Sequence, residues 1–402
     1  MVGFRDLSLV RPMLEAAMRR FSVVTSLILL GMLAGCGGGG APSNGSASGG
    51  GGGEAVIGCN LELSGESAPW GQDSKNGILL AQEEVNAKPE QKVKLKTVFE
   101  DDKSEPGASK NAMKKLITQD NVLAVIGAVG SNRTLAAADV AMEEKVPLMT
   151  HASTNVTITK KGEYVSRICF QDDFQGAVMA KFARNSLKAE TAVIMVSKGN
   201  AYSEGLTVSF RKVFTEMGGK ILEELAYQKG VQDFKTHVTT LKQLNPAVVW
   251  VPGYFNEVGL IIKQAREAGF QAPFLGGDGW DDRELFKLAG PAIKGNFVCN
   301  HFDPGDPDPV VQDFVKRYKA KYNVVPGAMA ALGYDALYAM ADAANRAKEL
   351  KPEAMKNAIN SIKDVKGVCG SITMGPDREV VKNAVVLETG ETDFKYKETI
   401  KP

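Results

Sequence analysis

Metal-ligating and redox-active residues are scarce in this chain. Its 402 residues contain five cysteines and only three histidines, His151, His237 and His301. The histidines lie far apart and no two cysteines form a CxxC pair, so the spacings of a zinc site and of a redox dithiol are both missing. The run Asp303–Pro309 is rich in aspartate but lacks the ligand spacing of a calcium loop. We expect no metal and no cofactor.

The sequence also lacks the short motifs of common enzyme classes. It has no GxSxG nucleophile turn, no GxxxxGK[ST] phosphate loop and no HExxH zinc helix. A GxGxxG match at Gly35–Gly40 follows no strand and precedes no amphipathic helix, so it is not a dinucleotide-binding fingerprint. The formal net charge of +1 gives no reason to expect nucleic acid as a partner. Nothing in these patterns favours an enzyme, although an α/β enzyme remains an alternative.

The amino terminus has the parts of a secretory signal. Two arginines precede the apolar run Phe21–Ala34, which is shorter than the ~20 residues needed to span a bilayer. The run ends in Leu-Ala-Gly before Cys36, which resembles the lipobox of bacterial lipoproteins, whose cysteine is lipidated after cleavage. Residues 36–54 are mostly glycine with serine and alanine, the composition of a flexible tether. We therefore expect residues 1–35 to be a lipoprotein signal peptide and Cys36 to carry the lipid.

From Ala55 onward, short apolar runs alternate with amphipathic stretches of helical period. This alternation predicts βαβ units and a parallel sheet covered by helices on both faces. A first series ends near Thr150 and a second begins near Ala192. Two series favour two doubly wound α/β lobes over one very wide sheet. The expected strands are 55–60, 93–100, 122–127, 146–150, 192–197, 221–228, 247–252, 273–276, 365–374 and 384–387.

Unusual residues gather in the loops that follow these strands. In open parallel sheets, ligands bind at the carboxyl ends of strands, beside helix amino termini. Hydroxyls there suit a carboxylate, a carboxylate suits an ammonium, and aromatic rings suit an apolar body. Each residue alone has an ordinary alternative, because serine also caps helices, tyrosine packs on surfaces and aspartate forms turns. Together they predict a site for a zwitterionic, partly apolar ligand at Trp70, Ser131, Thr154, Tyr202, Tyr254 and Asp278.

Four segments of the chain resemble the branched-chain amino-acid-binding proteins of bacterial ABC transporters, the leucine/isoleucine/valine-binding family. Their order and spacing carry the likeness from about Ala55 to Leu387. The resemblance implies a fold like that of type I periplasmic binding proteins, with two Rossmann-like lobes joined by a three-crossing hinge. The four segments are Leu63–Gly71, Val125–Ser131, Met149–Thr154 and Gly333–Ala336.

The resemblance also implies where the lobes begin and end. Lobe one would comprise 55–169 plus 301–369, and lobe two 170–300 plus 370–402. The crossings would fall near Arg167–Gln171, Val298–Phe302 and Cys369–Met374.

Three of the four cysteines that follow Cys36 would then lie near the hinge. In an exported protein these four residues either pair or remain buried thiols, and the sequence leaves both alternatives open. A disulfide between two hinge cysteines, which would stiffen the hinge, is one hypothesis. The four residues are Cys59, Cys169, Cys299 and Cys369.

The resemblance also assigns the residues of two loops, 127–134 and 150–155, that would hold the carboxylate of the ligand. Carried over, Ser131 and Thr154 would do so here, together with the backbone around Val129 and Ala152. Ser153 belongs to the same binding loop.

The remaining roles concern the other parts of the ligand. Asp278 would take the ammonium, at a position where many relatives carry glutamate. Trp70 stands where an aromatic ring shields the ligand side chain, while Tyr202 and Tyr254 would reach in from the second lobe.

The resemblance implies a monomeric extracytoplasmic protein, held at the membrane by its lipid alone, that closes two lobes around an amino acid and delivers it to an ABC transporter permease. A branched-chain or other apolar amino acid is expected. Alternatives are the same fold binding an amide, urea or an aromatic acid, or serving as a ligand sensor for a separate receptor. A carboxylate at position 278 favours an amine-bearing ligand, since a neutral or anionic solute would leave it unpaired.

Overall fold

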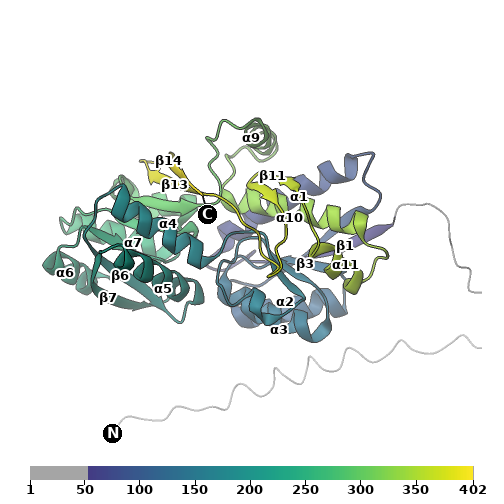
Figure 1. Ribbon diagram of the computed structural model, residues 1–402, viewed down its shortest axis with the longest axis horizontal. Helices are drawn as coiled ribbons and strands as arrows, with labels where there is room; N and C mark the ends of the chain where they lie inside the picture. The colour runs from purple at the N-terminus through teal and green to yellow at the C-terminus, as the bar shows by residue number, and fades with distance from the viewer. Residues whose placement is uncertain (1–52, 402) are drawn as a thin grey trace, which may run out of the picture. The chain divides into compact units, whose positions relative to one another are not determined.

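The computed structural model describes residues 53–401, so the expected signal peptide, Cys36 and almost all of the tether lie outside the described residues. The described part contains two large sheets, each the centre of one lobe (Figure 1), and a small two-stranded sheet. Lobe one is built on five parallel strands in the order β2-β1-β3-β4-β5. These strands are β1 (Glu54–Leu61), β2 (Lys94–Asp101), β3 (Ala124–Gly127), β4 (Leu148–Thr150) and β5 (Val165–Arg167).

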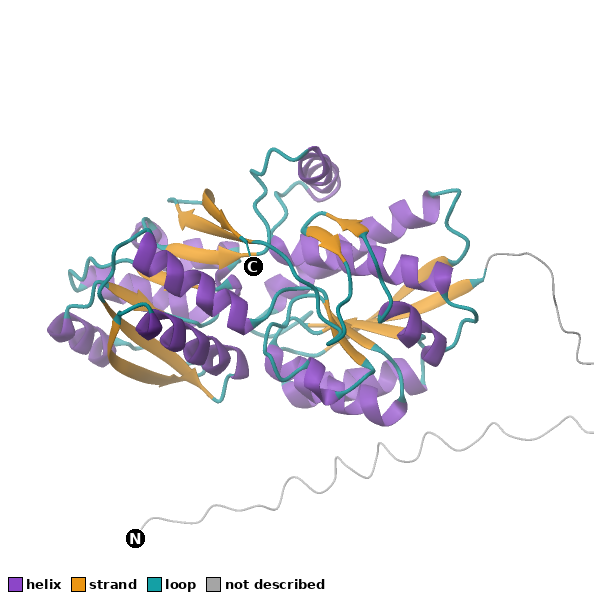
Figure 2. Cartoon of the chain, in the orientation of Figure 1, coloured by secondary structure: helices purple, strands orange, loops and turns teal. Residues whose placement is uncertain are grey.

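Helices cover both faces of the lobe-one sheet (Figure 2). Side chains alternate along β3, so Ala124 and Ile126 enter the core beneath α1 and α10, whereas Val125 enters the core beneath α2 and α3. The α1–α10 contact is close because a Cβ on Gly77 would lie 2.0 Å from the carbonyl oxygen of Ala330. The helices are α1 (Ala68–Ala87), α2 (Pro106–Thr118), α3 (Ser131–Glu144), α9 (Pro309–Tyr322), α10 (Ala328–Arg346) and α11 (Pro352–Ile359).

Lobe two is built on a seven-stranded sheet in the order β14-β13-β10-β9-β8-β6-β7. Five of its strands run parallel, and β13 and β14 add an antiparallel edge. The strands are β6 (Thr191–Lys198), β7 (Lys220–Gln228), β8 (Val248–Trp250), β9 (Phe274–Gly276), β10 (Phe297–Asn300), β13 (Ala384–Thr389) and β14 (Phe394–Ile400).

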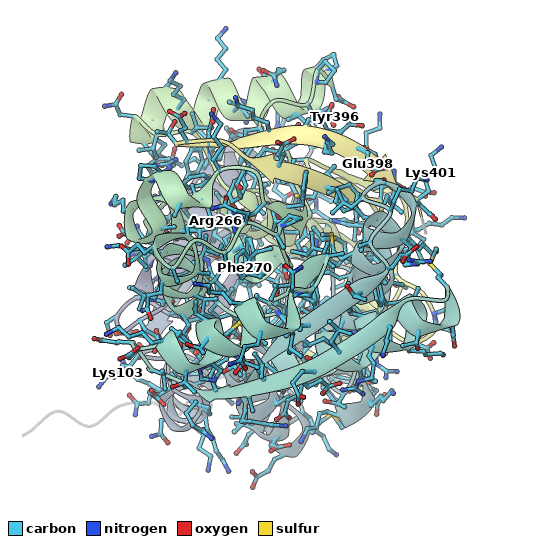
Figure 3. All side chains as sticks on the ribbon, turned by 90° about the vertical axis from the view of Figure 1, so that its left-hand side faces the viewer. Lys103, Arg266, Phe270, Tyr396, Glu398 and Lys401 are labelled. Atoms are coloured by element: carbon cyan, nitrogen blue, oxygen red, sulfur yellow. The ribbon has the colours of Figure 1, made fainter. Side chains whose placement is uncertain are left out.

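The lobe-two sheet is also covered on both faces. Along β8, Val248 and Trp250 pack against α4 and α5, whereas Val249 packs against α6 and α7. The end of α7 is closed by Arg266, whose guanidinium donates to the carbonyl oxygen of Phe270 at 2.9 Å (Figure 3). The helices are α4 (Asp172–Asn185), α5 (Ala201–Glu216), α6 (Lys235–Leu244), α7 (Phe255–Glu267) and α8 (Arg283–Ala289).

The two lobes and their covered parallel sheets agree with the fold expected from the sequence. The carboxyl-terminal part differs in detail. The stretch expected as one strand at 365–374 is a hairpin of β11 (Val365–Gly367) and β12 (Gly370–Ile372). Strand β14 was not expected from the sequence, and its Tyr396 is exposed (Figure 3).

The chain stays with lobe one further than the resemblance implied. Ile372, Met374 and Val380 pack in the core shared with α1 and α10, and the lobe-two strand β13 begins at Ala384. Residues up to Val380 thus pack with lobe one, beyond the segment Cys369–Met374 where the resemblance placed the third crossing.

The hypothesis of a hinge disulfide is wrong in this structure. Cys59, Cys169 and Cys299 are buried, Cys369 is partly buried, and all four are free thiols. Burial raises the pKa of each thiol. Of the helices in residues 53–401, none combines the length and apolar character needed to cross a membrane.

Candidate ligand-binding site

One pocket collects the residues predicted from the loops after strands. About 220 Å³ inside it is not filled by protein atoms, a figure that includes space open to solvent. Gly279 and Met329 complete a lining that otherwise consists of predicted residues. The predicted residues in the lining are Trp70, Val129, Ser131, Ala152, Thr154, Tyr202, Tyr254 and Asp278.

Both lobes contribute to this pocket through the carboxyl ends of their parallel strands. In lobe one, Ser131 follows β3 and Thr154 follows β4. In lobe two, Tyr202, Tyr254 and Asp278 follow β6, β8 and β9 in the same way. The position of these residues agrees with the rule that open parallel sheets bind ligands beyond their carboxyl ends.

Two hydroxyls give the pocket an anion-binding end. Ser131 is the first residue of α3, where the backbone N–H groups of the first turn have no carbonyl partner in the helix. The Oγ of Ser131 and the Oγ1 of Thr154 are buried and make no hydrogen bond of normal length to the protein, although the Thr154 hydroxyl lies beside the carboxyl group of Asp172, whose pKa burial raises and this hydroxyl lowers. Buried hydroxyls normally have a partner, so this pair suits a ligand that accepts hydrogen bonds, and the helix amino terminus favours an anionic one.

Two further residues that the sequence predicted for the site hydrogen-bond within the protein. Ser153 does not line the pocket, because its Oγ donates to the carbonyl oxygens of Ala128 and Val129 at 3.0 and 2.7 Å. Val129 lines the pocket, and its backbone N–H donates to the carboxylate of Glu62 at 3.0 Å.

A buried ion pair fixes the turn between β3 and α3. The Oε1 of Glu62 accepts hydrogen bonds from the N–H of Gly130 at 2.9 Å and from the Nε of Arg133 at 2.6 Å. Both side chains are buried. The Arg133 guanidinium also lies 5.9 Å from the ring centroid of Tyr254 in lobe two. Glu62 was not predicted as a residue of the site. Its position, as a lone carboxylate at the end of the apolar strand β1, is the signal in the sequence that indicates it.

Asp278 is held in place by three side chains. Its Oδ1 accepts hydrogen bonds from Gln175 Nε2 and Tyr202 OH, each at 2.9 Å, and its Oδ2 lies 3.0 Å from His301 Nε2. Burial lowers the pKa of His301 and raises that of Tyr202, which favours the uncharged form of each side chain. Among residues 53–401 no lysine or arginine pairs with this carboxylate, and His301 is its only titratable basic neighbour.

The charges around Asp278 decide which group of a ligand its carboxylate favours. A buried carboxylate is costly unless it is paired with a cation, and hydrogen bonds from neutral groups compensate it only in part. Because Asp278 lines the same pocket as Ser131 and Thr154, an ammonium on the ligand would complete the pair. Gln175 and His301 were not predicted, because they act on Asp278 and follow no recognisable motif.

Aromatic rings close the apolar side of the pocket. The rings of Trp70 and Tyr254 meet edge to face with centroids 4.9 Å apart, and Tyr202 lies 5.3 Å from Tyr254. The indole Nε1 of Trp70, in lobe one, donates to the carbonyl oxygen of Asp281, in lobe two, at 3.0 Å. These rings provide a rigid apolar surface that crosses the boundary between the lobes.

Two α/β lobes joined by three crossings, with a polar and aromatic pocket between their strand ends, define a two-lobed solute-binding protein. The chain belongs to the periplasmic binding protein family, which matches residues 54–393.

Similar proteins have related names. A Leu/Ile/Val-binding protein homolog of Brucella abortus is 30% identical over 80% of this chain and 86% of its own length. The crystal structure of a leucine-binding protein from Thermotoga maritima has a TM-score of 0.83 and 35% identity, covering 87% of this chain and 99% of that one. A branched-chain amino acid transporter substrate-binding protein from Streptococcus pneumoniae, solved with isoleucine, has a TM-score of 0.82 and 31% identity, covering 87% of this chain and 100% of that one.

Proposed function

We propose that the protein captures an α-amino acid with an apolar side chain, of the branched-chain class, and delivers it to an ABC importer. One observation carries the proposal: the buried carboxylate of Asp278, which pairs with no lysine or arginine among the described residues, shares its pocket with the buried hydroxyls of Ser131 and Thr154. An ammonium and a carboxylate on one small ligand satisfy both ends. The names of the leucine-binding and isoleucine-bound relatives support the same ligand class.

The mechanism is closure of the two lobes around the ligand. The ligand carboxylate first binds lobe one at Ser131 and Thr154. Lobe two then brings Asp278 to the ammonium, and Tyr202 and Tyr254 to the side chain, which excludes water and strengthens each charged hydrogen bond. Gln175 and His301 keep the carboxylate of Asp278 oriented during closure.

We assign the lobes in agreement with the packing of the third crossing. Lobe one comprises residues 55–169 and 301–380, and lobe two comprises residues 170–300 and 381–402. Apart from the third crossing, these are the bounds implied by the resemblance. A proteolysis experiment that releases fragments cut near these crossings supports the assignment.

The anchor belongs to the same proposal. Cleavage before Cys36 and lipidation of its thiol would hold a monomeric protein at the outer side of a membrane, with the glycine-rich tether leaving it free to meet the permease. Mass spectrometry of the mature chain tests this point, and an unmodified Cys36 would contradict it.

Thermal-shift measurements followed by titration calorimetry test the ligand class. We expect L-leucine, L-isoleucine or L-valine to raise the melting temperature and to bind with one site per chain. Urea, acetamide and benzoate serve as comparison ligands, since benzoate lacks the ammonium and the two neutral amides lack both charged groups. A protein that binds one of these and none of the amino acids refutes the proposal.

The aromatic lining favours a second candidate, an aromatic acid. Trp70, Tyr202 and Tyr254 offer faces and edges to a ring. Such a ligand would leave the carboxylate of Asp278 without a cation, which makes it the weaker candidate. Binding of benzoate in preference to leucine would establish it.

A further inference from the structure

Ala201 of lobe two is held by two asparagines of lobe one. Its N–H donates to the Oδ1 of Asn132 at 2.8 Å, and its carbonyl oxygen accepts a hydrogen bond from the Nδ2 of Asn155 at 2.7 Å. The Nδ2 of Asn132 also donates to the carbonyl oxygen of Gly199 at 2.7 Å. Three side-chain-to-backbone hydrogen bonds therefore cross between the lobes at one short segment.

Each of these asparagines directly follows a hydroxyl of the pocket. Asn132 comes after Ser131 at the start of α3, and Asn155 comes after Thr154 in the loop beyond β4. Neither asparagine lines the pocket. The same two backbone segments thus offer a hydroxyl to the ligand and, one residue later, an amide to lobe two.

The segment that they hold is rigid and leads directly to the pocket. Asn200 caps α5, because its Oδ1 accepts hydrogen bonds from the N–H groups of Tyr202 at 3.1 Å and Ser203 at 3.4 Å. Tyr202 follows Ala201 in the chain, and its hydroxyl donates to Asp278 and accepts from the N–H of Gly279. A displacement of Ala201 is therefore passed on to the groups proposed to meet the ligand.

We propose that Asn132 and Asn155 form a clamp on Ala201 that couples occupation of the hydroxyl end of the pocket to lobe closure, and so sets how slowly the ligand is released. This inference rests on the proposed function. The asparagines are positioning residues. A ligand that orders the loops of Ser131 and Thr154 also orders the side-chain amides of the two asparagines, which hydrogen-bond to lobe two. Since their bonds to lobe two form only when the lobes are closed, the clamp acts on dissociation more than on the first encounter.

Asn132→Ala is the direct test, because it removes two of the three bonds. Asn132 is the second residue of α3 and partly exposed, and alanine is a good helix former, so the fold is expected to persist. Stopped-flow tryptophan fluorescence measures association and dissociation of L-leucine. We expect the dissociation rate to rise about tenfold or more, as the loss of two hydrogen bonds implies, with the association rate within about threefold of the original. The melting temperature without ligand is expected to stay the same.

Ala201→Pro removes the same contact from the other lobe. Ala201 is the first residue of α5, a position that proline tolerates, and Asn200 before it already has the extended backbone that proline requires (φ −99°, ψ 105°). If the clamp exists, the double variant Asn132→Ala/Ala201→Pro releases ligand about as fast as Asn132→Ala alone, because the bond lost in Ala201→Pro is one of the two lost in Asn132→Ala. Multiplied effects of the two changes overturn the proposal.

Asn360→Ala is the matched control. The Nδ2 of Asn360 donates to the carbonyl oxygen of Glu163 at 3.0 Å within lobe one, so its loss leaves the clamp intact. We expect its release rate to match that of the original protein. An unchanged release rate in Asn132→Ala, or a change confined to the association rate, overturns the clamp. If Asn132→Ala does not fold, Ala201→Pro alone decides between these outcomes.

The test also separates the clamp from the proposed function. If the original protein does not bind an amino acid, the amino-acid assignment fails. The release rates are then measured with whichever amide or aromatic acid of the thermal-shift panel binds. Faster release of that compound from Asn132→Ala still supports the clamp, and equal release refutes it.

Discussion

His301 Nε2 lies 3.0 Å from Asp278 Oδ2, so a residue of the second crossing between the lobes bonds directly to the pocket carboxylate. The imidazole also stacks on Phe170 of the first crossing, with ring centroids 3.6 Å apart. Two of the three crossings therefore pack together immediately behind Asp278. Any change in hinge angle moves the groups that orient this carboxylate, which links lobe closure to the strength of the proposed ammonium site.

Replacing Asp278 tests that site. Asp278→Ala is expected to weaken L-leucine binding by at least about a hundredfold, since the loss of a buried charged partner costs about 3 kcal/mol or more. Calorimetry gives the affinity, and circular dichroism confirms that the fold is retained. Asp173→Ala, at an exposed position of α4, is the control and is expected to bind normally. An affinity unchanged by Asp278→Ala refutes the ammonium assignment.

The pair of Glu62 and Arg133 predicts an effect on stability. In Arg133→Met the carboxylate of Glu62 stays buried without its cation, and we expect the free energy of unfolding to fall by about 3–5 kcal/mol. Arg211→Met breaks a partly exposed pair with Glu224, and its cost is expected to be below about 1 kcal/mol. Urea denaturation compares the two variants. Equal losses would show that burial of the Glu62 pair has no special weight.

The sequence predicted the helices and strands well where apolar periodicity is strong. Strand β14 was not predicted because its side chains are mostly exposed and polar, with Lys395 and Lys397 on a sheet edge. Its pairing with β13 depends on a partner that local pattern does not reveal. The sequence did not show that Ile372 and Met374 pack with lobe one, because an apolar side chain reveals its lobe only through the core that it joins.

The residues of the candidate site also fall into a group that local sequence pattern predicts and a group that it does not. Residues that face the pocket, such as Ser131 and Asp278, were predictable because strand ends converge in any open parallel sheet. Residues that act through others were not. Glu62, Gln175 and His301 are far from their partners in sequence, and only the folded chain brings them together.

The free cysteines give a simple chemical prediction. With all four thiols reduced and mostly buried, Ellman's reagent is expected to react slowly with the folded protein, because burial keeps the thiols protonated. In guanidinium without reductant, four thiols beyond Cys36 are expected to react at once. A count of two would reveal a disulfide and contradict the structure.

Two carboxylates from different lobes flank Gly327. A Cβ built there would lie 3.5 Å from Asp73 Oδ2 of lobe one and 3.3 Å from Asp281 Oδ2 of lobe two. Burial raises the pKa of each to about 6, assisted for Asp73 by the charge of Asp281 and opposed for both by Arg283. Tyr318 donates to Asp73, and the N–H of Ala328 and the Asn300 side chain bond to Asp281.

Asp282 adds a third, partly exposed acid to this contact. Burial raises its pKa to about 7, and Asp73, Asp281 and Glu284 raise it further, while the N–H of Glu284 opposes the shift. All three carboxyl groups thus bind protons more tightly here than an aspartate does in water.

The raised pKa values of these carboxyl groups predict that low pH favours the closed form. A carboxyl whose pKa is higher in the closed than in the open state takes up a proton on closing, so its contribution to closure is present at low pH and is lost as the pH rises through about 6 to 7. We expect the affinity for L-leucine to increase several-fold from pH 7.5 to pH 5.5. Asp73→Asn removes one acid, so it should bind more tightly at pH 7.5 and show a flatter profile. Asp173→Asn on the exposed face of α4 should keep the original slope. Calorimetry across this range decides the matter: an affinity that falls on acidification, or an Asp73→Asn profile as steep as the original, rules out these carboxyls as the source.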